Sequence, residues 1–325
     1  MTGQAAIRTL LPMLLILTAS VGWADPFMGQ YAGTFHADSM TQRPATAVVV
    51  AEGEDHYRVR IEAVSNEPGR AGETIEVYAG RSGFEALIGS RSGGYHWSGR
   101  IKDGQLSLAS AYGTRFELNK VVRKSPKEGL EPPAGAVVLL PYKQGTKPDL
   151  SAWTNQEWKA LDNGTMQVAK GSTTTKERFG DIQHLHLEFW LPLEPLNRGQ
   201  GRCNSGVFLN DLYEVQILDS FGLVESSGDC GSLYGVKRPD VNASLPPQQW
   251  QTYDIEFRAA RLNGDGTVKE HARITAYLNG VKIHDNVAIP HPTANPNAEQ
   301  KPTGPIQLQD HGHPIQFRNI WLVKG

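Results

Sequence analysis

Short stretches of alternating hydrophobic and polar residues recur along the chain. The clearest covers residues 183–190, where leucine and phenylalanine would face one way and His184, His186 and Glu188 the other. Asn279-Gly280 separates two further alternating stretches and predicts a tight β-hairpin turn. Beyond the N-terminus, no long segment has the 3.6-residue period of an amphipathic helix. The pattern therefore predicts an all-β protein of many antiparallel strands.

The alternating stretches fall into two groups, which predicts two domains. Those in residues 25–120 are separated by glycine-containing turns and predict a small antiparallel β domain. Residues 121–134, with the sequence VVRKSPKEGLEPPA, combine charge and proline without periodicity and predict a linker. Strands and turns then continue through residues 135–325, as in a β-sandwich or jelly roll.

Residues 1–24 have the pattern of a secretory signal peptide. Arg8 precedes an apolar run from Leu10 to Leu17, and Gly22-Trp23-Ala24 offers small residues at a cleavage position. The apolar run is too short to span a bilayer, and no later apolar segment approaches that length. We therefore expect cleavage after Ala24 and a mature protein without a membrane span, either secreted or periplasmic.

The charge balance and the cysteine content argue against nucleic-acid binding and against a cysteine-based zinc site. The net charge is −2, from 32 Lys and Arg against 34 Asp and Glu, and no basic run indicates nucleic acid as a partner. In an oxidising compartment Cys203 and Cys230 would form a disulfide, with two buried free thiols as the alternative. Two isolated cysteines match no cysteine-based zinc site.

Residues 199–222 hold the densest group of candidate site residues. They predict two strands joined by a tight turn, and alternation places Glu214 and Gln216 on one face of the second strand. Asp219 would join that face through a one-residue bulge, a feature that often lies beside active sites. Two carboxyl groups that flank an amide suit acid–base catalysis. The alternative is an edge strand with a solvated polar face.

Six motifs follow one another in residues 135–325. They are Asn204-Ser205-Gly206, Tyr213-Glu214-Val215-Gln216-Ile217-Leu218-Asp219-Ser220, Trp250-Gln251-Thr252-Tyr253-Asp254, Asn279-Gly280-Val281, Leu308-Gln309-Asp310-His311-Gly312 and Phe317-Arg318-Asn319-Ile320. In this order they resemble the 3-keto-disaccharide hydrolase domain family, long described as a domain of unknown function. The resemblance implies a concanavalin-like jelly roll and an enzyme that acts on 3-keto-glycosides. It assigns no role to residues 25–120.

The resemblance implies a carbohydrate substrate with a ketone at C3. Such a ketone acidifies the hydrogen on C2, so a base can form an enolate that expels the group at C1, after which water adds to the enone. We expect Glu214 or Asp219 to be the base, and His311 to be the acid because imidazole titrates near neutrality. Direct hydrolysis is the alternative route.

Further polar residues are expected to bind the substrate or the enolate: Arg202, Asn204, Gln216 and Asp310. A divalent metal could hold the enolate instead, with His186, Glu188, Glu214 and His311 as its ligands. The structural alternatives are surface histidines on a strand and an aspartate that closes a turn.

Two other functions share the jelly-roll fold. A lectin-like module would line a groove with exposed aromatic residues and lack nearby carboxyl groups. An ordinary glycosidase would set two carboxyl groups across an open cleft and would also cleave unoxidised glycosides. Convergence of Glu214, Asp219 and His311 in one hollow would favour the enzyme that acts on 3-keto-glycosides.

Overall fold

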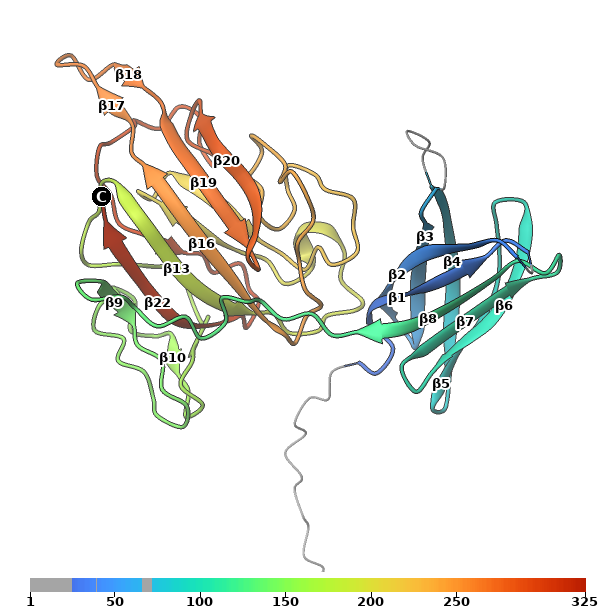
Figure 1. Cartoon of the computed structure of the whole chain (residues 1–325). Coiled ribbons are helices and arrows are strands. Elements are labelled where there is room, and N and C mark those ends of the chain that lie inside the picture. The colour runs from blue at the N-terminus through green and yellow to red at the C-terminus, as the bar shows by residue number, and fades with distance from the viewer. Residues whose placement is uncertain (1–24, 39, 66–71) are drawn as a thin grey trace, which may run out of the picture.

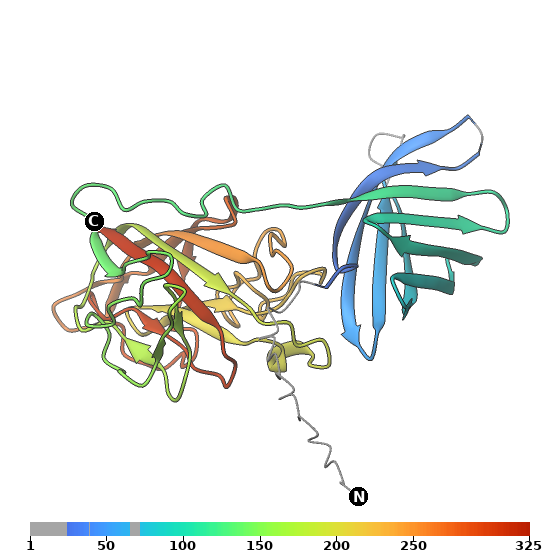
Figure 2. The same ribbon diagram turned by 90° about the horizontal axis from the view of Figure 1, so that it is seen from below.

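Two β domains make up the described part of the chain (Figure 1 and Figure 2). The computed structural model describes residues 25–38, 40–65 and 72–325, so the expected signal peptide, residues 1–24, lies outside it. Within these ranges, no helix has the length and apolar character needed to cross a membrane. The all-β prediction is confirmed, because the only assigned helix in the described part is the three-residue 3-10 turn η1 (Gly199–Gly201).

The first domain is a closed antiparallel barrel in which each strand pairs with the next and the last closes on the first. Its strands are β1 (Gly29–His36), β2 (Gln42–Gly53), β3 (His56–Ala63), β4 (Glu73–Ser82), β5 (Glu85–Ser92), β6 (Tyr95–Lys102), β7 (Gln105–Ser110) and β8 (Arg115–Val121). Along β7, Leu106 and Leu108 are buried while Gln105 and Ser107 are exposed. This alternation fills the barrel with hydrophobic side chains.

The second domain is a sandwich of two antiparallel sheets, which confirms the predicted jelly roll. The large sheet has the order β10-β11-β22-β13-β16-β19-β20, with β9 paired to β22, and the small sheet has the order β12-β21-β14-β15. The large-sheet strands are β9 (Val137–Leu140), β10 (Lys159–Ala160), β11 (Met166–Gln167), β13 (Ile182–Trp190), β16 (Trp250–Arg258), β19 (Ala272–Leu278), β20 (Val281–Ile289) and β22 (Gln316–Lys324). The small-sheet strands are β12 (Thr173–Thr174), β14 (Ser205–Leu209), β15 (Tyr213–Ile217) and β21 (Gln307–Leu308). A separate ribbon joins β17 (Arg261–Leu262) to β18 (Val268–Glu270).

The hydrophobic core of the sandwich lies between the two sheets. Leu185 of β13 and both Val215 and Ile217 of β15 are buried in it. Because side chains alternate along a strand, the intervening residues face away from the core on opposite sides of the sandwich. We call these surfaces the large-sheet outer face, which carries His184, His186 and Glu188, and the small-sheet outer face, which carries Gly206, Glu214 and Gln216.

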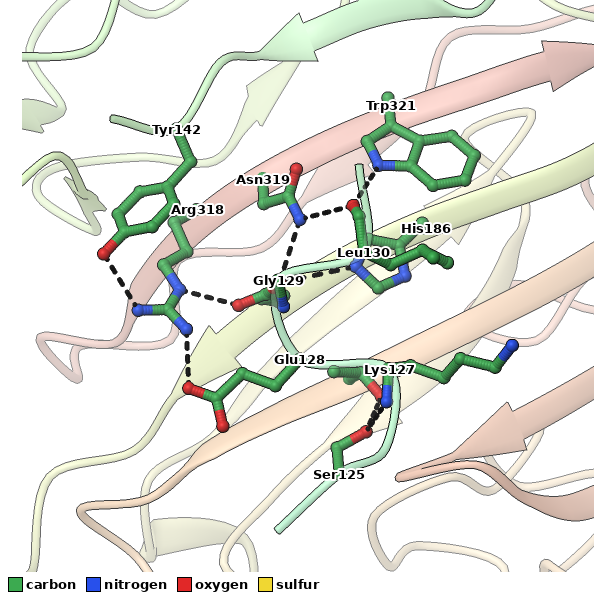
Figure 3. Close-up of polar contacts among 12 residues, drawn as sticks. Ser125, Lys127, Glu128, Gly129, Leu130, Tyr142, His186, Arg318, Asn319 and Trp321 are labelled. Atoms are coloured by element: carbon green, nitrogen blue, oxygen red, sulfur yellow. Dashed lines mark hydrogen bonds and ion pairs between the residues drawn. The ribbon is translucent and has the colours of Figure 1, made fainter. Parts of the chain in front are cut away.

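The predicted linker is bound to the large-sheet outer face (Figure 3). We call residues 125–130 the strap. The Gly129 N–H donates a hydrogen bond to Glu188 Oε1 over 2.6 Å, and Ser125 Oγ lies 2.7 Å from Thr252 Oγ1. The segment between the domains is therefore held by buried side chains rather than left free in solvent.

Arg318 of β22 forms ion pairs with both the strap and the sheet. Its Nη2 donates to Glu128 Oε1 of the strap over 2.8 Å, and its Nε donates to Glu188 Oε2 over 2.6 Å (Figure 3). The guanidinium group lies 4.0 Å above the Trp250 ring and 4.5 Å from the Tyr142 ring centroid. These contacts satisfy the charges of a largely desolvated arginine and a fully buried glutamate.

The two domains meet at the loop that follows β15. Phe221 of this loop is 2% exposed and packs against the hydrophobic residues of the barrel domain. Arg202 donates from Nε to Asp219 Oδ2 over 2.6 Å and from Nη2 to the Ala51 carbonyl of β2 over 3.2 Å. An ion pair of the second domain therefore also makes a contact with the first.

The expected disulfide between Cys203 and Cys230 is wrong, because both residues are buried free thiols. Cys203 Sγ donates to the Pro192 carbonyl over 3.0 Å, whereas Cys230 Sγ lies 3.3 Å from the Tyr253 hydroxyl. Each thiol thus has its own polar partner. Burial raises the pKa of both thiols, which keeps them protonated and unreactive at neutral pH.

Candidate functional site

The small-sheet outer face brings the Glu214 carboxyl group against a glycine of the neighbouring strand. In the β14–β15 pair, Gly206 lies opposite Gln216 and Phe208 lies opposite Glu214. A Cβ atom at Gly206 would lie 2.2 Å from Glu214 Oε1, so a larger residue would displace the carboxyl group. Steric contact with Glu214 therefore explains why the third residue of the Asn204-Ser205-Gly206 motif is glycine.

Burial sets the acid–base properties of Glu214. The residue is 3% exposed, and its backbone N–H donates to Thr293 Oγ1 over 2.9 Å. Burial raises the pKa of Glu214 from its ordinary value of 4.5 to about 7. Near neutral pH this carboxyl group can therefore either take up or release a proton, as general acid–base catalysis requires.

Three primary amides lie beside Glu214 in one hydrogen-bonded cluster. Gln200 Oε1 accepts from Asn204 Nδ2 over 2.9 Å and from Gln216 Nε2 over 3.0 Å. Gln200 Nε2 in turn donates to the Gly228 carbonyl over 2.8 Å. Asn204 Oδ1 is buried and has no hydrogen-bond partner among the described residues. The cluster thus holds one acceptor in a fixed direction for a further donor.

The chain after β21 adds a third segment to this face. The Gln309 N–H donates to the Gly206 carbonyl over 3.0 Å, and the Gln309 carbonyl accepts from Ser205 Oγ over 2.7 Å. Gln309 Oε1 is also buried and unpaired in the described part of the chain. The small-sheet outer face therefore combines a proton-transfer group with amides, which can hydrogen-bond sugar hydroxyls.

A second polar cluster lies on the large-sheet outer face. Asp254 Oδ1 lies 2.8 Å from His184 Nε2 and 2.9 Å from His186 Nδ1, and the His186 ring stacks on Trp321 with 5.2 Å between centroids. Burial alone would raise the pKa of Asp254, but hydrogen bonds from the two histidines outweigh it and lower the pKa to about 2. One candidate ligand atom from each of these three polar residues lies within 4.8 Å of the others.

Comparison of the sequence with known protein families assigns the second domain to one of them. Residues 139–323, more than half of the chain, match the 3-keto-alpha-glucoside-1,2-lyase-like domain. The chain belongs to this family. The resemblance of the six sequence motifs is thereby confirmed, and the protein belongs to a family of carbohydrate-active enzymes. No curated protein matches the chain.

Solved structures of Parabacteroides distasonis ATCC 8503 proteins resemble this member of the 3-keto-glucoside-lyase-like family. One, described as a "putative glycosyl hydrolase", is 35% identical, covers 59% of this chain and 85% of its own, and has a TM-score of 0.54. Another protein of that organism with the same description is 17% identical, covers 55% of this chain and 90% of its own, and has a TM-score of 0.41.

In this 3-keto-glucoside-lyase-like protein, Arg202 and Asp219 are engaged with each other. Asp219 lies beyond the end of β15, and its carboxylate accepts from Arg202 Nε over 2.6 Å and from the Phe221 N–H over 3.3 Å. The expected pairing of Asp219 with Glu214 on one open face is not formed. Arg202, the partner of Asp219, also donates from Nη2 to the Ala51 carbonyl of the first domain.

The Asp310-His311-Gly312 motif forms a turn. Asp310 Oδ1 accepts from the Gly312 N–H over 2.8 Å, and its Oδ2 accepts from the Gly171 N–H over 2.7 Å, so this carboxylate holds backbone segments together. His311 is exposed and follows Gln309 by two residues, on the segment that borders the small-sheet outer face. Within the described ranges, no hydrogen bond joins His311 to Glu214.

The expected metal-ligand set does not form. It comprised His186, Glu188, Glu214 and His311. The first two lie on the large-sheet outer face and Glu214 lies on the small-sheet outer face, with the hydrophobic core between them. His186 instead groups with His184, its neighbour in the alternation, and with Asp254, which lies opposite it on β16.

Sequence reasoning missed Gln200 and a histidine–carboxylate pair. His313 Nδ1 lies 2.8 Å from Glu194 Oε2. Burial alone would raise the pKa of Glu194, but hydrogen bonds, that of His313 foremost and one from the Cys203 backbone among them, hold it below its ordinary value. The His311-Gly312-His313 spacing was the available signal for the pair, whereas Gln200, in a short turn, carried none.

Proposed function

We propose that the protein cleaves 3-keto-glycosides on the small-sheet outer face, with Glu214 as the base that removes the C2 proton. The observation that carries this proposal is the buried Glu214 carboxyl group, whose pKa of about 7 suits proton transfer at neutral pH. Membership of the 3-keto-alpha-glucoside-1,2-lyase-like family supports the substrate class.

The steps follow from the ketone at C3. Ionised Glu214 takes the C2 proton, and the C–H electron pair forms the enolate of that ketone. The enolate electrons then form the C1–C2 double bond while the bond from C1 to the leaving oxygen breaks. His311 is our candidate for the proton that this oxygen takes up. Water adds to C1 of the enone and a proton returns to C2, so the net reaction is hydrolysis.

The amide cluster would orient the sugar. Gln216 Nε2 gives one of its two N–H groups to Gln200, which leaves the other for a substrate oxygen. Both N–H groups of Asn204 are used by the Gln200 backbone and side chain, so its unpaired Oδ1 would accept from a sugar hydroxyl. We therefore expect Asn204 to act as an acceptor and Gln216 as a donor.

Matched 3-keto and unoxidised glucosides that carry the same chromogenic aglycone test this proposal. The wild-type protein should release the aglycone from the 3-keto compound alone. Glu214→Gln should lower kcat/KM at least about 100-fold, the scale of a lost general base, without lowering the melting temperature. Asp211→Asn makes the same chemical change at an exposed position of the β14–β15 turn and should leave the rate unchanged.

Other results would point elsewhere. Equal release from both glucosides would indicate an ordinary glycosidase, and release from neither, with retained binding, would indicate a lectin-like module. Full activity of Glu214→Gln would remove Glu214 from the mechanism. The pattern of residues 1–24 supports the further proposal that the protein acts outside the cytoplasm. N-terminal sequencing of the protein from its native host would show whether cleavage follows Ala24.

A further inference from the structure

The His184, His186 and Asp254 cluster arises from strand pairing. Asp254 of β16 lies directly opposite His186 of β13, so their side chains project from the same face of the large sheet. The β13–β16 register shifts between Ile182 and Leu185, and His184 lies within this irregularity. Such irregularities re-aim side chains, and here the His184 ring reaches the Asp254 oxygen that His186 also contacts.

The three side chains have the chemistry of a transition-metal site. Two imidazoles and a carboxylate suit zinc, nickel or copper better than calcium or magnesium, which prefer oxygen ligands. Asp254 Oδ1 lies 2.8 Å and 2.9 Å from the two imidazole nitrogens. Ligand atoms about 2.0–2.2 Å from a tetrahedral zinc ion lie roughly 3.4 Å apart. The cluster would therefore need to open by about half an ångström, with the facing imidazole protons released to solvent.

Two unpaired atoms give independent support. Asp254 Oδ2 and His186 Nε2 are buried, and neither has a hydrogen-bond partner in the described part of the chain. His186 Nε2 lies 3.5 Å from Glu188 Oε1. A metal ion on Nδ1 would fix the ring proton on Nε2, where it points to this carboxylate. Carboxylates commonly orient metal-bound histidines in this way.

A cavity reaches the cluster from solvent. It has a volume of about 820 Å³, and the residues that line it include His184, Asp254, Lys127 of the strap and Tyr277. A metal ion held by three protein ligands keeps a coordination position for water or for a small molecule. The cavity gives such a ligand access to this position, and its volume is in the range of small-molecule sites.

We propose that His184, His186 and Asp254 bind one transition-metal ion of the zinc class, with its remaining coordination position open to the cavity. Glu188 orients His186 from behind, as a positioning residue. The site lies on the opposite side of the sandwich from Glu214 and is independent of the function proposed there.

Metal titration of the full chain tests this site. After treatment with a chelator and its removal, Zn²⁺ should bind with one tight site per chain in isothermal titration calorimetry and should raise the melting temperature. His184→Ala should weaken binding at least tenfold and abolish the thermal shift. The His184 side chain is 33% exposed, so its loss should not prevent folding. Glu214→Gln should bind Zn²⁺ as the wild type does.

Two matched controls separate this site from general surface binding. Glu256→Gln changes an exposed carboxylate that lines the same cavity, and His271→Ala removes an exposed histidine elsewhere on the jelly-roll domain. Both variants should retain wild-type affinity. Absence of a tight site, or equal affinity of the wild type and His184→Ala, would overturn the proposal and leave the cluster as a hydrogen-bonded structural element.

Discussion

Glu188 and Glu214 lie on the two outer faces of one sandwich, yet the pKa values of their carboxyl groups shift in opposite directions. Both residues are at most 3% exposed. Burial raises the pKa of Glu214 to about 7. Burial would raise the pKa of Glu188 as well, but the nearby His186 imidazole, hydrogen bonds from Asn319 and Gly129, and the charge of Arg318 hold it below its ordinary value.

The difference shows that partners, rather than depth, separate a structural carboxylate from a reactive one. Glu188 is surrounded by donors from β22 and from the strap, so its ionised form is satisfied and has no reason to exchange protons. Glu214 lies over Gly206 beside amides that bond mainly to one another. Desolvation without compensation leaves it available for proton transfer.

Neutralising Glu188 should have the largest effect on the stability of the protein. Glu188→Gln leaves Arg318 with less compensation in a buried position, and we expect a loss of about 3 kcal/mol in the free energy of unfolding, measured by urea denaturation. Glu256→Gln, at an exposed position of the neighbouring strand, should change stability by less than about 0.5 kcal/mol. A Glu188→Gln variant as stable as the wild type would show that the network does not depend on the charge.

The pH dependence of turnover tests whether Glu214 acts as the base. A base must be ionised, and the pKa of Glu214 is raised to about 7. Below that value kcat/KM on a 3-keto-glucoside should fall about tenfold per pH unit, because a growing fraction of Glu214 is protonated and cannot act as the base. Circular dichroism at each pH would check that the fold persists. A rate that stays constant from about pH 5 to pH 8 would contradict the role of Glu214.

The smallest expected effect concerns the strap. Ser125 Oγ bonds to Thr252 Oγ1 over 2.7 Å and accepts from the Lys127 N–H over 3.1 Å. Ser125→Ala should cost about 1 kcal/mol and speed hydrogen exchange at the Gly129 amide. Ser107→Ala, at an exposed barrel position, serves as the control. Unchanged exchange at Gly129 would mean that Ser125 does not anchor the strap.

The sequence predicts the architecture well because alternation is a local property. Residues 183–190 alternate as expected, with Leu185 in the core and His186 facing out. Alternation does not say which strands become neighbours, or which side of the sandwich a polar face occupies. For that reason His186 and Glu214 were expected in one metal site, although the hydrophobic core separates them.

Long-range partners account for the other missed features. The composition of residues 121–134 suits a linker, and only the fold brings Glu188 and Arg318 to the strap. The expected exported compartment alone suggested a disulfide, but the Cys203 thiol donates to the Pro192 carbonyl and the Cys230 thiol lies beside the Tyr253 hydroxyl. Asp219 matched a catalytic pattern in the sequence, whereas the structure pairs it with Arg202.

Phe221 makes the two domains depend on each other, although each has its own sheets. The phenyl ring belongs to the second domain by sequence, but it is buried against hydrophobic residues of the first. Removal of the barrel would expose this ring and the backbone around it to water, so a truncated jelly roll should be less soluble than the intact chain. Evolution cannot exchange the barrel for another module without also redesigning the loop that carries Phe221.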